Sequence, residues 1–251
     1  MVGRIVGTMV VAGLVGGCAA EPALRPRGSK PSPNPAAFEG GPPYAPTIDP
    51  ADFVAVIDNP YLPLTPGTTR VYEGVSDGEK ERNEVTITDE TNVVMGVTTT
   101  VVRDRVFVTG ELAEETFDWF AQDRFGNVWY FGEDSNDYEK GKLVSTKGSW
   151  EAGVDGAQPG IVMPANPLVG ETYRQEFYEG EAEDMATVLE LNGSVQVPFG
   201  SYDRVVKTED FTPLEPDVVE EKQYAPGIGV VREEIVRGGD GFLELIDVRT
   251  A

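Results

Sequence analysis

From about residue 69 onward, short runs of apolar, threonine and aromatic residues alternate with clusters of glycine, asparagine and aspartate. Runs of this length between turn-forming residues are typical of β-strands. Turn pairs such as Asp77-Gly78 and Asn192-Gly193 are short, so neighbouring strands should pair antiparallel. A helix is expected only in short pieces, such as residues 50–57. The predicted strands are 69–75, 84–88, 97–108, 115–122, 127–132, 142–146, 173–179, 186–191, 202–208, 218–224, 230–236 and 242–249.

Two parts of this region resemble each other. Landmarks recur at spacings of 103 to 106 residues, for example Met95-Gly96 against Phe199-Gly200. Such spacing predicts an all-β fold made by duplication of an antiparallel meander, arranged as an open barrel, a half-barrel or a sandwich. The halves are predicted at about 60–147 and 165–237. A Gly/Pro-rich loop at 148–164, which contains Trp150, is expected to join them and to pack as an ordered loop.

The first eighteen residues carry a separate signal. Arg4 precedes an uncharged stretch from residue 5 to 17, which is shorter than the roughly 20 residues that span a bilayer. Val15-Gly16-Gly17-Cys18 resembles the lipobox of bacterial lipoproteins. That resemblance implies that residues 1–17 are a cleaved signal peptide and that Cys18 carries the lipid, as palmitate and related acyl chains. Cys18 is the single cysteine, and a lone thiol in an exported chain needs such an explanation.

Residues 18–52 are rich in proline and glycine and show no apolar periodicity, so they are predicted to be a disordered tether. The strand-rich domain would then occupy 53–251. An exported, lipid-anchored location is expected. Ala19 after the cysteine points to the outer membrane in a Gram-negative cell, whereas the anchor would lie in the cell membrane of a Gram-positive cell.

Composition excludes several kinds of chemistry. The chain has 43 acidic and 20 basic residues, a net charge of −23, which argues against nucleic acid as a partner. It contains no histidine, so Ser-His-Asp catalysis and imidazole metal sites are ruled out. No glycine-rich phosphate loop occurs. No catalytic residue, cofactor or metal ligand is therefore assigned, and the protein is expected not to be an enzyme.

Carboxylates are the remaining reactive groups. Glu115 with Asp118, or Glu220 with Glu221, are candidate pairs for glycoside cleavage, against the simpler expectation that they lie on solvated outer strand faces. Two acidic clusters, at 133–139 and 179–184, are expected at turns. Such clusters suit either calcium or plain solvation.

An aromatic set, which is Trp119, Phe120, Trp129, Tyr130 and Phe131, is expected to pack in the core, with a ligand cavity as the alternative. Strand alternation should send Trp119 and Phe120 to opposite faces, and likewise Trp129 and Tyr130.

The Pro-Leu-x-x-Gly motif at 63–67 and the segment from Tyr224 to Val231 are similar to β-rich exported domains of an uncharacterised family of bacterial lipoproteins. That resemblance implies a twisted sheet curled into a half-barrel. The leading hypothesis is a non-enzymatic lipoprotein that binds a small apolar ligand or an envelope component. A structural or protein-interaction module of the envelope and a carboxylate-dependent carbohydrate-active enzyme are the alternatives.

Overall fold

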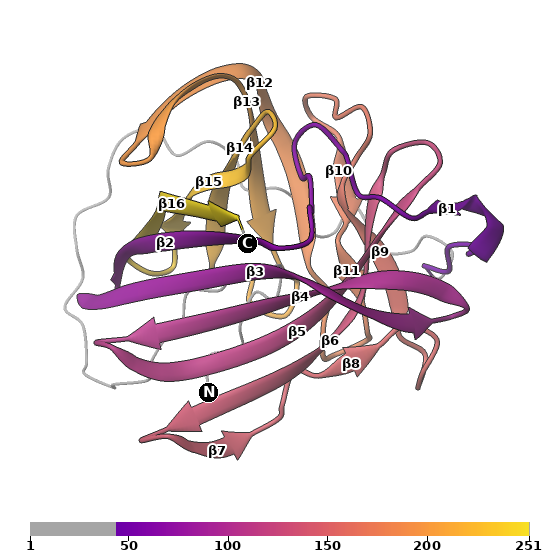
Figure 1. Ribbon diagram of the computed structural model, residues 1–251, viewed down its shortest axis with the longest axis horizontal. Helices are drawn as coiled ribbons and strands as arrows, with labels where there is room; N and C mark the ends of the chain where they lie inside the picture. The colour runs from indigo at the N-terminus through magenta and orange to yellow at the C-terminus, as the bar shows by residue number, and fades with distance from the viewer. Residues whose placement is uncertain (1–43, 251) are drawn as a thin grey trace.

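A computed structural model describes residues 44–250, whose strands form one 16-stranded antiparallel sheet that curls into a nearly closed barrel (Figure 1). The all-β prediction is confirmed. Of the predicted arrangements, the structure agrees with the open barrel and not with the sandwich. The strands are β1 (Phe53–Val54), β2 (Thr68–Ser76), β3 (Glu79–Val94), β4 (Val97–Val108), β5 (Glu111–Asp123), β6 (Val128–Glu139), β7 (Lys142–Ser145), β8 (Trp150–Glu151), β9 (Gln158–Met163), β10 (Thr172–Arg174), β11 (Glu176–Phe177), β12 (Met185–Val197), β13 (Gly200–Phe211), β14 (Val219–Ala225), β15 (Gly229–Arg237) and β16 (Gly241–Thr250).

Tight hairpins hold the first half of the sheet together. The connections at 77–78, 95–96, 109–110 and 140–141 each have two residues, and both residues have a positive φ. Two positive φ values in a two-residue loop match the twist of paired strands. Glycine takes the second position in all four, because it adopts this backbone region without a steric penalty.

A short seam brings the two ends of the sheet together. Along the sheet, the order runs from β10 and β12 through β16, β2 and β6 to β9 and β11. β10 pairs with β12, and β11 pairs with β9, yet Gln175 alone separates β10 from β11 along the chain. Residues 172–177 therefore border both ends of the sheet. At Gly160 of β9, an added Cβ would lie 2.3 Å from the carbonyl carbon of Gln175, so the two backbones pass very close here.

Strand positions follow the duplication that the sequence predicts. β4 begins at Val97 and β13 at Gly200, while β6 begins at Val128 and β15 at Gly229. A hydrogen bond recurs as well: the Gly67 amide donates to Ile87 at 2.9 Å, and the Gly170 amide donates to Val188 at 2.8 Å. Equivalent turns therefore lead into the sheet in both halves.

Two local expectations need correction. The linking segment 148–164 is not only a loop, because it supplies β8 and β9, and β9 pairs with β6. The short helix expected at 50–57 is a single 3-10 turn, Pro50–Asp52, capped by the Asp49 carboxylate. β1 follows it directly and pairs with β5. Pairing with distant strands determines the structure of both segments, and local composition does not reveal that pairing.

The predicted signal peptide, Cys18 and most of the tether lie outside the described residues. The tether's last part, from Tyr44 onward, is described and packs on the seam: the Tyr44 hydroxyl donates to the Pro159 carbonyl at 3.0 Å, and its ring meets Phe177 edge-on. Nowhere in residues 44–250 is there a helix with the length and apolar character needed to cross a membrane.

Candidate functional site

The inside of the barrel is divided into an apolar end and a polar end. Along the first part of β3, the buried positions are Glu81, Asn83, Val85 and Ile87, in that order, and the residues between them are more exposed. β13 runs antiparallel to β3, and its buried residues change from apolar at Val206 to acidic at Asp210. On these two strands the buried polar residues therefore lie at the same end of the barrel, near the turns at 77–78 and 109–110.

Ten of the buried carboxylates form a set that we call the inner carboxylates; several lie toward the polar end, whereas Asp118 and Glu133 are level with Val102 and Ile87 in the strand register. They come from β3, β4, β5, β6, β11, β13, β14 and β15 and from the residue before β12. All are at most 6% exposed. The set is Glu81, Asp104, Glu114, Asp118, Glu133, Glu176, Asp184, Asp210, Glu220 and Glu233.

Lys222 places one ammonium group among them. Its side chain is 1% exposed, and its Nζ lies 3.3 Å from Asp210. Asp210 also accepts hydrogen bonds from Thr208 and from Gln175, the latter at 3.1 Å. Burial opposes the charge on Lys222, but the surrounding carboxylates, Asp210 first, raise its pKa overall. Lys222 therefore stays protonated and neutralises part of the inner charge.

Glu233 faces Lys222 from the neighbouring strand β15. Burial raises the pKa of Glu233 well above its ordinary value; Lys222 opposes this, and the nearby Glu220 and Asp104 add to it. Asp104 belongs to β4, four strands away in the sheet order, so Glu233 points across the interior. Neither carboxylate oxygen of Glu233 has a hydrogen-bond partner.

Glu176 occupies the seam on β11 and is fully buried. Burial raises its pKa well above the ordinary value, and the neighbouring Asp184 and Glu133 raise it further. The Trp150 indole and the Asp184 backbone lie near enough to lower this pKa, but no partner meets normal hydrogen-bond geometry at either carboxylate oxygen. Glu176 is thus a second carboxylate with unmet hydrogen-bonding capacity.

Asp118 has partners of its own. It accepts a hydrogen bond from the Tyr130 hydroxyl at 2.8 Å and another from Thr116 at 3.1 Å. Burial raises the pKa of Asp118 to about 6, although both hydrogen bonds act to lower it. On β14, burial likewise raises the pKa of Glu220 to about 7, with Lys222 opposing the shift.

Such an arrangement is costly unless something compensates it. A buried, ionised carboxylate loses its hydration, and the effective penalty is several kcal/mol for each ion that stays unpaired. Two responses relieve the cost: the group keeps its proton, or a cation enters. Perturbed carboxylates gathered in one interior are therefore a candidate binding site.

The candidate glycosidase pairs are not brought together. Asp118 is an inner carboxylate, whereas Glu115 pairs with Arg103 on the outer face. Glu220 is likewise inside, and Glu221 binds Lys207 outside at 2.7 Å. Odd spacing along a strand separates each pair. The expectation that these residues lie on outer strand faces is wrong for Asp118 and Glu220 and right for Glu115 and Glu221.

The two acidic clusters also differ from expectation. Residues 133–139 belong to β6 and not to a turn, and Glu133 is buried inside the barrel. Residues 179–184 do form a turn region, but its last member, Asp184, is 2% exposed. Within residues 44–250, no three Asp, Glu, His or Cys side chains are grouped closely enough to hold a metal ion.

The aromatic set packs largely as core. Phe120, Tyr130 and Phe131 are fully buried, and Phe120 stacks on Tyr130 with ring centroids 4.9 Å apart. Trp119 and Trp129 are partly buried against the core. Tyr130 links core and site, because its ring is stacked while its hydroxyl reaches Asp118.

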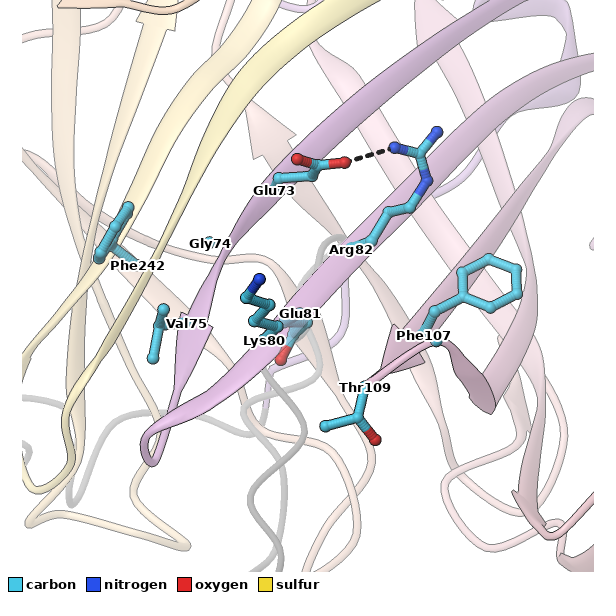
Figure 2. Close-up of a pocket in the computed structure, with 10 residues that line it drawn as sticks. Glu73, Gly74, Val75, Lys80, Glu81, Arg82, Phe107, Thr109 and Phe242 are labelled. Carbon is cyan, nitrogen blue, oxygen red and sulfur yellow. Dashed lines mark hydrogen bonds and ion pairs between the residues drawn. The ribbon is translucent and has the colours of Figure 1, made fainter.

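A groove of about 640 Å³ is a second candidate, and it involves mainly outward-facing side chains of β16, β2, β3 and β4. Figure 2 shows Phe242 and Phe107 on opposite sides of it, with Glu73 and Arg82 joined by an ion pair of 2.7 Å. Arg82 also binds Glu84 at 2.9 Å. Glu84 also binds Arg105 at 2.6 Å, so the two arginines and two glutamates of this network balance in charge.

No protein-family model and no curated protein matches the sequence. One similar solved structure, from Bacteroides fragilis, is provisionally assigned as an exported protein with a YmcC-like fold. Its TM-score is 0.45, its identity is 15%, and the match covers 76% of this chain and 99% of the other. A second, provisionally assigned as a lipoprotein of Parabacteroides distasonis, has a TM-score of 0.41 and 11% identity, and covers 75% and 98% of the two chains.

Proposed function

We propose that this protein is an exported, lipid-anchored binding protein without enzymatic activity, and that its barrel holds a positively charged small molecule. Cys18 and the lipobox support the anchor. The observation that carries the binding role is the pair Glu176 and Glu233, whose four carboxylate oxygens are buried without hydrogen-bond partners. A cation beside such a group supplies both charge and hydrogen bonds.

A charged ligand suits this interior better than the apolar ligand expected from the sequence. At the apolar end, a cavity between residues such as Leu64, Val102 and Tyr224 measures about 30 Å³. That volume is on the scale of one water molecule. Residues of the apolar end therefore serve as core, and the unpartnered oxygens of Glu176 and Glu233 favour a charged ligand.

The outer groove supports a second candidate function. Its volume of about 640 Å³ lies in the range of small-molecule sites, and Phe107 and Phe242 offer apolar contact surface. A small apolar ligand or a segment of another envelope component would bind there. Binding at this groove would be insensitive to Glu233→Gln and weakened by Phe107→Ala.

Native mass spectrometry of the full-length protein, purified from membranes in mild detergent, tests the leading proposal. The wild-type protein should retain a cationic small molecule, and Glu233→Gln should lose most of it. Glu221→Gln, which changes an outer carboxylate, is the matched control and should retain it. Wild-type protein that carries an apolar ligand instead, unaffected by Glu233→Gln, would contradict the charged-ligand proposal.

Metabolic labelling with palmitate tests the anchor separately. The label should enter the wild-type protein and be absent from Cys18→Ser, because the chain has no other cysteine. Cys18→Ser should also leave the membrane fraction. Continued labelling of Cys18→Ser would show that another residue carries the lipid.

A further inference from the structure

We propose that the ligand of the inner carboxylates is a linear polyamine, a flexible chain carrying several ammonium groups separated by methylenes. The inference rests on the proposed function and names its ligand class. Three features of the site carry it: how its charges are distributed, which cation it already accommodates, and what lies beside the charges.

The inner carboxylates surround the interior instead of converging on one point. Nine of them lie on eight strands of the sheet, β3 to β6 on one side and β11 and β13 to β15 on the other, and Asp184 directly precedes β12. No three of the described carboxylates are close enough to hold one metal ion. A ligand that neutralises several of them must therefore carry its own charges at several separated positions.

Lys222 shows which cation fits. Its side chain is a primary ammonium on a four-carbon stem, and that ammonium is buried 3.3 Å from Asp210 and near Glu220 and Glu233. A polyamine repeats the same unit: an ammonium joined to three or four methylenes. The protein thus already stabilises one such group by close contact with a buried carboxylate.

Glu176 marks a place for a second ammonium. The charges acting most strongly on it are the carboxylates of Asp184 and Glu133, in contrast to Glu233, on which Lys222 acts. Both oxygens of Glu176 lie in the interior without a partner of normal geometry. An ammonium with three donors can satisfy such a carboxylate.

Apolar and aromatic side chains lie beside the charged positions: Leu243 pairs with Glu233 across β15 and β16, and Tyr130 lies near Glu133 and Glu176. Tyr72, Leu243 and Tyr130 are fully buried, and the Tyr72 hydroxyl already donates to the Val230 carbonyl at 2.9 Å. Their rings and aliphatic carbons suit methylene stems, and aromatic faces also attract ammonium groups. A polyamine matches this combination of charged and apolar side chains.

Isothermal titration of the full-length protein in detergent, at fixed ionic strength, tests the proposal. The probes are spermine, spermidine, propylamine and Ca²⁺. Spermine and spermidine should bind at least ten times more tightly than propylamine or Ca²⁺. Glu176→Gln and Glu233→Gln should each weaken spermine binding about tenfold, while Glu221→Gln, the outer control, should leave it unchanged.

The outcomes separate this inference from the proposed function. Equal affinity for propylamine and spermine, or tighter Ca²⁺ binding, would overturn the polyamine inference and leave a cation-binding protein. If no cation binds, the proposed function fails as well. An equal loss of affinity in Glu221→Gln would show that spermine binds the outer surface. Circular dichroism confirms folding, and Glu220→Gln replaces any variant that fails to fold.

Discussion

Glu220 and Glu221 are consecutive residues of β14, yet they lie on opposite sides of the barrel wall. Glu221 binds Lys207 on the outer face at 2.7 Å and is partly exposed. Glu220 is 6% exposed and faces the interior, where Lys222 and Asp210 influence its pKa. Two identical side chains on one strand therefore report on the two environments of this barrel.

Replacing each of them with glutamine should have opposite effects on stability. Glu220→Gln removes a buried charge with little change of shape, so it should raise the free energy of unfolding at pH 8 by about 1–3 kcal/mol. Glu221→Gln removes a partly exposed ion pair and should lower it by less than about 1 kcal/mol. Denaturant unfolding measures both. A destabilised Glu220→Gln would show that the ionised carboxylate is well compensated.

Acid should stabilise the protein between pH 8 and about pH 5. The pKa values of Asp118 and Glu220 are raised to about 6 and about 7, above their ordinary values of 3.8 and 4.5. In that pH range the folded state binds more protons than the unfolded state, so the free energy of unfolding rises as pH falls. Unfolding in urea at pH 5, 6, 7 and 8 tests this.

A control variant identifies the source of that pH dependence. The double substitution Asp118→Asn and Glu220→Gln removes two titrating groups, so its stability should vary less over the same range. A wild-type free energy of unfolding that is flat or rises from pH 5 to pH 8 would contradict the assignment.

Lys222→Met should destabilise the fold strongly. Methionine keeps much of the stem's volume but leaves Asp210, 3.3 Å from the lost ammonium, and its neighbours without that cation. Removing one partner of a buried ion pair costs about 3–5 kcal/mol. Chemical denaturation at pH 7 measures the loss, and Lys207→Met, at the outer pair with Glu221, is the control that should cost less than about 1 kcal/mol.

Strand alternation predicted much of the fold. All twelve predicted strands correspond to strands of the sheet, and 97–108 matches β4 at both ends. The two-residue turns and the recurring spacing are local or repeated signals, so they can be read without knowing long-range pairing. β8 and β9 were missed because a Gly/Pro-rich segment resembles a loop until its pairing with β6 is known.

The site was harder to predict than the fold. Alternation separates Glu220 from Glu221, but it does not say which of them faces inward. Acidic residues are usually exposed, so the expectation was a solvated face. The sequence did contain one signal. On β3, β5 and β14, an acidic residue stands at an even spacing from apolar residues, as Glu81 does from Val85 and Ile87, so it faces the same side of the sheet. If the acidic residues on these apolar faces had been predicted to be buried, the prediction would have identified the inner carboxylates of these strands.

The seam gives the final prediction. Gly160→Ala places a Cβ about 2.3 Å from the Gln175 carbonyl carbon, and real Cβ atoms do not approach backbone so closely, so β9 must move away from residues 172–177. β11 carries Glu176, so this shift should disturb the candidate site as well as the fold. We expect Gly160→Ala to lower the free energy of unfolding by about 2–3 kcal/mol, the range for overpacked cores, and to weaken spermine binding in the same preparation.

Gly193→Ala is the matched control for that substitution. Gly193 is also a strand glycine, in β12, but its added Cβ would meet its nearest neighbours at 3.4 Å, an ordinary contact distance. It should change stability by less than about 1 kcal/mol and leave spermine binding intact. If Gly160→Ala proves as stable as Gly193→Ala, the seam backbones are not in close contact. If Gly160→Ala is destabilised but binds spermine normally, the ligand does not depend on the position of Glu176, and the binding site must lie nearer to Lys222 and Glu233.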